Sequence, residues 1–206
     1  MPRLTAVRRR ALDEMMKEAI FEATVAVLAE HGVEGMTMDR VASAAGVAKG
    51  SLYNYFSSKK ELLEFVYAKL VDPTFKELAE TVASDRPAIE KLSTHVRNML
   101  GHFAKHARVC KLVFEDDAVF GLLQSTHRST QKAGSQRLAE IFRQGIAEGV
   151  FRPADPAGLA LIYLGLCKGV FDSQPDLTQP DQRERAHRMI VGTLLHGITT
   201  EKGRND

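Results

Sequence analysis

Residues 49–55 have the composition of a surface that contacts nucleic acid. They read Lys-Gly-Ser-Leu-Tyr-Asn-Tyr, with Leu52 as the one aliphatic residue. Lysine and asparagine side chains bond to phosphates and to base edges, and small residues let a backbone approach closely. Tyr53 and Tyr55 are unusual on so short a polar segment unless they contact a partner. The segment therefore predicts polar contacts with phosphates and bases.

A second set of residues has the spacing of metal ligands. His102, His106 and Cys110 lie at i, i+4 and i+8, and the acidic residues 115–117 follow. Three ligands on one helix span about 12 Å of rise, too far to reach a single ion. No Ser/His/Asp or Cys/His grouping has a supporting motif, and no glycine-rich phosphate loop follows a strand. We expect no metal site, no cofactor and no catalytic residue.

A helix–turn–helix pattern surrounds the polar segment. Thr37 is a good N-cap for a helix ending at Ala45, Gly46-Val47 forms a turn, and a short helix follows from about Lys49 to Tyr55. The turn needs a glycine because its backbone angle is strained for other residues. Small or apolar residues occupy the positions that should face inward: Val41, Ala42, Ala45, Val47, Leu52 and Phe56.

The remainder of the chain predicts an all-α fold, since apolar spacings of three and four dominate and strand signals are missing. A boundary near residue 71 separates a helix–turn–helix unit (1–71) from a larger helical body (72–206). Asp72-Pro73 should stop or bend the helix that joins them. The other expected helices are about Asp13–His31, Lys59–Val71, Pro87–His106, Arg108–Glu115, Val119–Gly149, Asp155–Phe171 and Asp181–Thr200.

The distribution of charge points to a polyanionic partner for the N-terminal part. The 206 residues have a formal net charge of +2, and residues 1–60 hold nine Lys and Arg against seven Asp and Glu. Residues 61–206 hold nineteen of each. Four arginines lie between Arg3 and Arg10, an arm expected to be flexible that either enters a DNA minor groove or stays a solvated tail.

The composition also indicates in which cellular compartment the protein is expected. No stretch free of Asp, Glu, Lys and Arg is longer than twelve residues, whereas a membrane span needs about 20 apolar residues. Asp13 and Glu14 follow the arginines where a signal peptide would need its apolar region. Two cysteines do not make a disulfide framework. We expect a soluble protein of the reducing cytoplasm with no membrane partner.

One late helix is apolar on nearly all sides. Between Ala157 and Phe171 only Lys168 is charged. Such a helix is either a central core helix or a subunit interface formed with the helix at about 181–200. The candidate interface residues are Leu166, Gly169, Met189, Ile190 and Leu194.

Residues 20–63 resemble the DNA-binding region of the tetracycline-repressor (TetR) family. The matching features are Ala23, Gly32, Thr37, Val41-Ala42, Ala45-Gly46-Val47, Gly50, Leu52-Tyr53, Phe56, Lys59 and Glu61-Leu62. One departure is Ala48, where the family often has a serine or threonine whose hydroxyl caps the next helix. The resemblance covers about a fifth of the chain tightly, and the chain length and helical body also suit the family.

The resemblance implies a role for each matching polar residue. Thr37 would cap its helix and contact a phosphate. Lys49, Gly50 and Ser51 would face the major groove. The DNA backbone would be contacted by Tyr53, Asn54 and Tyr55, and Lys59 would pair with a phosphate.

The resemblance also implies a homodimer, paired through its last two helices, that binds a near-palindromic double-stranded DNA operator. The leading expectation is a transcriptional repressor released by a small, mostly apolar effector. Phe103, Cys110 and Phe114 are the expected pocket lining, because they lie near a helix break at Ala107-Arg108. The competing functions are an effector-independent chromosome-binding protein and a helical ligand carrier that does not bind DNA.

Overall fold

The computed structural model describes residues 2–114, 117–173 and 176–198, and its regular elements in these ranges are all helices. The all-α prediction is confirmed. The chain divides into two compact units. The first comprises Met1–Leu70 and Arg108–Thr126, and the second comprises Val71–Ala107 and His127–Asp206. Residues 108–126 thus pack with the helix–turn–helix rather than with the remainder of the body.

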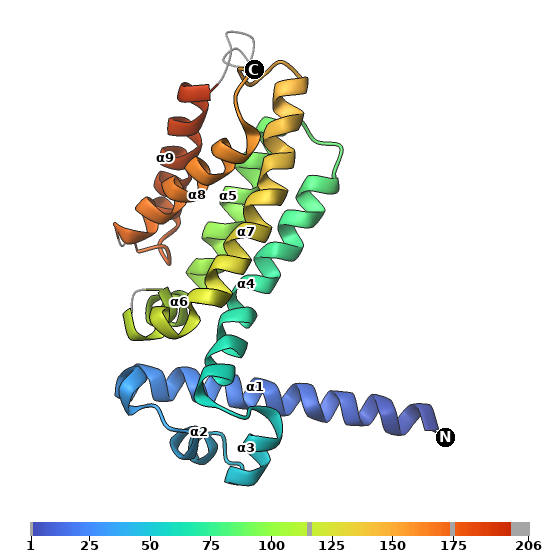
Figure 1. Ribbon diagram of the computed structural model, residues 1–206, viewed down its shortest axis with the longest axis vertical. Helices are drawn as coiled ribbons and strands as arrows, with labels where there is room; N and C mark the ends of the chain where they lie inside the picture. The colour runs from blue at the N-terminus through green and yellow to red at the C-terminus, as the bar shows by residue number, and fades with distance from the viewer. Residues whose placement is uncertain (1, 115–116, 174–175, 199–206) are drawn as a thin grey trace. The chain divides into compact units, whose positions relative to one another are not determined.

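The first unit begins with three helices, α1 (Pro2–Gly35), α2 (Met38–Ala44) and α3 (Lys49–Tyr55). In Figure 1, α1 lies across α2 and α3. Their shared core is apolar and includes Ile20, Val41 and Leu52, which are completely buried. Gly32 interrupts α1 with a φ of 64°, in the left-handed region, at the predicted stop.

The start of α1 differs from the prediction. The helix begins at Pro2, so the arginine arm is helical rather than flexible. Two sequence features explain this. Proline suits the first position of a helix, where its missing N–H costs nothing. Arginine, alanine and leucine, which make up most of residues 3–12, are strong helix formers.

Helix α4 (Lys59–Ala83) runs through Pro73, where a stop or bend was expected, and contains the boundary between the units. Proline removes one backbone donor but does not end a helix that packing stabilises on both sides. The hydroxyl of Thr74 donates to the carbonyl of Val71 at 2.7 Å. The first unit is completed by α6 (Ala107–Phe114) and the start of α7 (Asp117–Ala147).

The second unit is a helical body formed by part of α4 and α7 together with α5 (Ala88–Lys105), α8 (Pro156–Asp172) and α9 (Pro180–Ile198). Helix α9 packs on both α5 and α8. Asp155 caps α8 by accepting from the amides of Ala157 and Gly158. The large residues at the centre of the core are Phe142, Phe151 and Tyr163, all 1% exposed or less.

Candidate nucleic-acid interface

The turn between α2 and α3 has the geometry that a helix–turn–helix requires. Thr37 caps α2, because its hydroxyl accepts from the amide of Arg40 at 3.2 Å, as predicted. Gly46 has a φ of 68°, a conformation that a side chain would strain. Leu52 and Phe56 face inward and are buried. Ala48 precedes α3 without a side-chain cap, in line with the departure seen in the sequence.

The outer face of α3 presents most of the predicted contact residues to solvent. Lys49, Gly50 and Asn54 are exposed, and Tyr53 is 45% exposed. An added Cβ on Gly50 would have open space around it, so another surface can approach the backbone closely there. Ser51 and Tyr55 are half-buried at the edges of the same face. The helix therefore offers a small polar surface with one flat aromatic ring.

Lys49 has a partner that the sequence analysis missed. Its ammonium pairs with the carboxylate of Asp39 on α2, at 2.7 and 2.9 Å from the two oxygens. The hydrogen bond to Asp39 raises the pKa of Lys49. Both side chains are exposed, so the ammonium is held above α3 while its other N–H groups face outward. Ten residues separate the pair in sequence, and only the turn brings them together.

Tyr55 connects α3 to the first turns of α1. Its hydroxyl donates to the carboxylate of Asp13 at 3.0 Å, and this bond raises the pKa of the phenol. Arg9 acts on the same phenol in the opposite direction, through its charge. Forty-two positions separate the bonded residues, and no local pattern indicates the contact.

The start of α4 positions Lys59. Ser58 caps the helix by accepting from the amide of Glu61 at 3.2 Å. The Glu61 carboxylate accepts from the amide and hydroxyl of Ser57, and these bonds lower its pKa. Lys59 follows this cap, half-buried, and its ammonium donates to the carbonyl of Val33. In the free protein, Lys59 therefore ties α4 to the end of α1.

Two parts of the chain match known sequence families. Residues 20–66 match the family described as "Bacterial regulatory proteins, tetR family", and residues 85–172 match "Tetracyclin repressor-like, C-terminal domain". The HTH-type transcriptional repressor SCO4008 of Streptomyces coelicolor is 31% identical over 151 residues, which are 73% of this chain and 75% of that protein. The chain belongs to the TetR family. It is a DNA-binding transcriptional regulator, as the resemblance predicted.

Solved structures of the TetR fold extend over most of this regulator. SmeT, the repressor of a multidrug efflux pump of Stenotrophomonas maltophilia, has been solved with triclosan. That complex matches with a TM-score of 0.78 at 20% identity, over 91% of this chain and 93% of that one. FadR from Bacillus subtilis in complex with stearoyl-CoA matches with a TM-score of 0.72 at 20% identity, over 88% and 98%. At these identities the likeness shows the shared fold.

The predicted pocket residues of this TetR-family chain fall in different units. Phe103 belongs to the second unit, where its ring meets Phe171 edge to face with centroids 4.6 Å apart. Cys110 belongs to the first unit, and burial raises the pKa of its thiol to about 12. The side chain of Phe114 lies outside the described part of the structure. The three therefore do not form one cluster within a unit.

A buried polar group in the second unit is a better candidate for an effector contact. The hydroxyl of Tyr163 is fully buried and has no nitrogen or oxygen partner among the described residues. It lies beside the thiol of Cys167, and burial raises the pKa of the phenol well above its ordinary value. The ring of His95 is 5.8 Å away, and burial lowers the pKa of His95 to about 4. Both rings are therefore neutral at pH 7.

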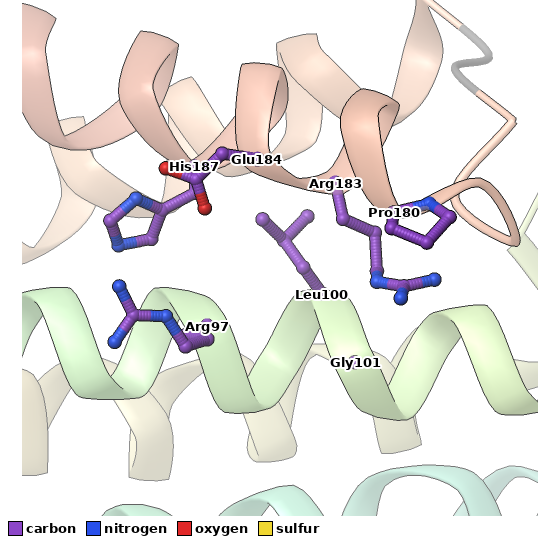
Figure 2. A pocket seen from close by; sticks show the side chains of 7 residues that line it. All are labelled: Arg97, Leu100, Gly101, Pro180, Arg183, Glu184 and His187. Atoms are coloured by element: carbon purple, nitrogen blue, oxygen red, sulfur yellow. The ribbon is translucent and has the colours of Figure 1, made fainter.

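A groove of about 320 Å³ also lies on the second unit, between α5 and α9 (Figure 2). Arg97 and Arg183 stand on either side of Leu100 in this view. Arg183 donates to the carbonyls of Leu177 and Thr178, and His187 bonds to Ser93. The two guanidinium groups do not converge on one point. The groove lining is Arg97, Leu100, Gly101, Pro180, Arg183, Glu184 and His187.

The structure corrects the predicted interface. Ile190 and Leu194 are 1% and 4% exposed and belong to the core of their own unit, because α9 turns that face toward α5 and α8. Leu166 is half-buried against the same core, whereas Gly169 and Met189 are exposed. The large apolar side chains that α8 does expose were missed: Leu161 and Ile162, at 56% and 58%.

Other features of this regulator bear on metals and membranes. In the described ranges, no three His, Cys, Asp or Glu side chains gather closely enough to hold a metal ion. The His102 and His106 rings lie 4.7 Å apart, while Glu115 and Asp116 lie outside the described residues. Within those ranges, no helix has the length and apolar character needed to span a membrane.

Proposed function

We propose that this TetR-family regulator is a homodimeric repressor that binds a near-palindromic operator through α3. The supporting observation is the outer face of α3. Lys49, Gly50, Tyr53 and Asn54 are exposed there while Leu52 anchors the helix from the inner side. A helix of this kind fits the major groove, and two copies in a dimer read two half-sites about 34–36 Å apart.

Each predicted contact residue then has a distinct role. Lys49, Gly50 and Ser51 face base edges in the major groove. Tyr53, Asn54 and Tyr55 lie along the backbone.

Two further residues contact phosphates in this proposal. Thr37 caps α2 and also contacts a phosphate. The ammonium of Lys59 donates to Val33 and keeps further N–H groups for a phosphate.

We further propose that a small, mostly apolar molecule releases the operator. Triclosan, in complex with SmeT, is a mostly apolar molecule, and stearoyl-CoA, in complex with FadR, carries a long apolar acyl chain on a charged CoA group; both proteins have this fold. In this chain the supporting feature is the apolar core of the second unit, with the hydroxyl of Tyr163 as a polar anchor and Phe103 packed against the same core cluster.

Release follows from linkage between two conformations. An effector that binds one conformation more tightly lowers the population of the other by its differential affinity. We assign DNA binding to residues 1–71 and effector binding and dimerisation to residues 72–206. Helix α4 belongs to both units, so it is the element through which the change passes.

The proposal also covers what the protein does not do and where it acts. A repressor of this kind works without catalysis and meets its operator in the cytoplasm. Effector-independent chromosome binding predicts DNA binding that no small molecule reverses. A ligand carrier without DNA binding predicts no shift of any duplex.

Selection of bound duplexes from random DNA, followed by titration at several salt concentrations, tests the DNA contacts. Lys49→Ala should reduce the preference for the selected operator over random DNA about tenfold or more, because a bidentate contact to guanine is worth ~1–3 kcal/mol. Lys59→Ala should weaken both duplexes alike and flatten the salt slope by about one unit per half-site.

Lys111→Ala is the matched control, because it removes an exposed lysine from α6 in the same unit. It should bind both duplexes as the unaltered protein does. Equal losses for Lys49→Ala on operator and random DNA would remove the base-reading role. A protein that shifts no duplex at low salt would remove the proposed function.

A further inference from the structure

The first turns of α1 form a helix that extends beyond the packed helix–turn–helix. Figure 1 shows the N-terminal end of α1 projecting past α2 and α3. Arg8, Arg9 and Arg10 are exposed on it. No hydrogen bond or ion pair within the described residues engages their guanidinium groups. Three adjacent cations on this helix are thus available to a partner.

The charges on this helix are arranged by face. At about 100° per residue, Arg9, Arg10 and Lys17 all lie within about 60° of Asp13 around the helix axis. Arg8 lies about 140° from Asp13, on the other side. The side opposite Asp13 holds apolar residues instead. Val7, Leu12 and Met15 are exposed there, at 65%, 65% and 69%.

The basic face is the one directed toward α3. Asp13 lies in the middle of that face and accepts the hydrogen bond from Tyr55 of α3. Arg9, one turn before Asp13, is close enough to Tyr55 to act on its pKa. The helix thus presents these cations next to the edge of α3 at which Tyr55 lies.

We propose that the N-terminal segment 2–12 of α1 is a second DNA-contacting element, in which Arg9 and Arg10 bind phosphates outside the bases that α3 reads. This inference rests on the proposed operator binding. Ten residues of helix rise by about 15 Å, which spans about four base pairs of duplex. Charge complementarity selects the partner, because the row of cations follows a face next to the recognition helix.

The apolar side of the segment does not have the arrangement expected of a helix that binds a lipid surface. An amphipathic helix on a membrane buries its apolar face and keeps its cations at the headgroups. Here Arg8 lies between Leu12 and Met15 around the helix axis, so burial of that face in a membrane would also bury a cation. Binding to anionic vesicles is therefore an outcome to be tested, not the expectation.

The test compares Arg9→Gln/Arg10→Gln with Arg8→Gln in the full chain on the selected operator. The double variant should flatten the slope of log K against log salt by about 1.8 units per half-site, for two lost phosphate contacts. Its hydroxyl-radical footprint should lose protection at the outermost nucleotides of each half-site. Arg8→Gln removes one charge from the opposite face and should change neither, whereas Arg9→Gln and Arg10→Gln as single variants should each flatten the slope by about 0.9 units.

An unchanged slope and footprint for the double variant, with the unaltered protein binding its operator, would overturn this inference alone. An equal change in Arg8→Gln would also overturn it, because the effect would then come from net charge. Sedimentation with phosphatidylglycerol vesicles that depends on Arg9 and Arg10, without a footprint change, would assign the segment to membranes. No operator binding by the unaltered protein would instead contradict the proposed function.

Discussion

Tyr163 is a polar residue in an apolar core, and its hydroxyl has no nitrogen or oxygen partner within the described residues. A buried hydroxyl without a good partner costs about 1–3 kcal/mol of desolvation. Tyr163→Phe should therefore leave the free energy of unfolding unchanged or raise it by about 1 kcal/mol. Where triclosan or stearoyl-CoA releases the operator, the same change should weaken that release if the hydroxyl anchors the bound molecule.

Urea unfolding and a DNA-release titration measure the two effects on one variant. A loss of more than about 1 kcal/mol in unfolding free energy would show that the hydroxyl has a structural partner. Release by both probes at unchanged concentrations would show that it does not contact them. If the Tyr163→Phe protein is more stable but releases the operator less readily, the hydroxyl contacts the effector, because loss of a purely structural bond would lower stability.

Among the elements, the end of α7 is packed so tightly against the chain that follows that Gly145 has no room for a side chain. The amides of Val150 and Phe151 both donate to the carbonyl of Gly145, at 3.0 Å each. The Phe151 ring then lies against the backbone of α7, so that a Cβ on Gly145 would meet it at 2.2 Å. Gly145→Ala must displace a ring from the centre of the core and should cost about 1–3 kcal/mol.

Gly101→Ala is the control for helix propensity. Gly101 lies within α5, and an added Cβ there meets no atom within 4 Å. Alanine at such a position should be neutral or stabilise the helix by up to about 1 kcal/mol. Thermal unfolding of the two variants side by side should give opposite signs. A stable Gly145→Ala protein would mean that Phe151 has another position in the core.

For the whole molecule, the exposed apolar residues of α8 and α9 are the surface through which we propose that two subunits pair. Leu161 and Ile162 on α8 and Met189 on α9 are each at least half exposed, on two helices that pack together. Leu161→Glu places a carboxylate in that contact, where burial without a partner costs several kcal/mol. Sedimentation should show folded monomers and operator binding weaker by about tenfold or more.

Leu122→Glu is the matched control, since Leu122 on α7 is also exposed, at 40%. It should leave the sedimentation and the DNA affinity of the protein unchanged. A Leu161→Glu protein that still sediments as a dimer would place the interface elsewhere. An unaltered protein that is monomeric at micromolar concentration, with and without DNA, would contradict the dimer itself.

Features that depend on neighbouring residues could be predicted from the amino-acid sequence. Thr37 as a cap, Gly46 as a turn residue and the apolar inner side of α3 follow from short-range geometry, and the structure has each of them. The all-α class followed from helical spacing in the same way. The ends of helices were harder to predict. The start of α1 and the continuation of α4 through Pro73 depend on packing and on several weak helix propensities acting together.

Only the tertiary structure decided which residues meet across long separations. Asp13 and Tyr55 are 42 positions apart, and Lys49 finds Asp39 because a turn folds α3 back on α2. Ile190 and Leu194 share a helix with Met189, yet they face the core while Met189 is half exposed. An apolar pattern shows that a face is covered, but what covers it depends on the position of the other helices. Phe103 and Cys110, which we expected to line one pocket, likewise belong to different units, an assignment that local sequence does not indicate.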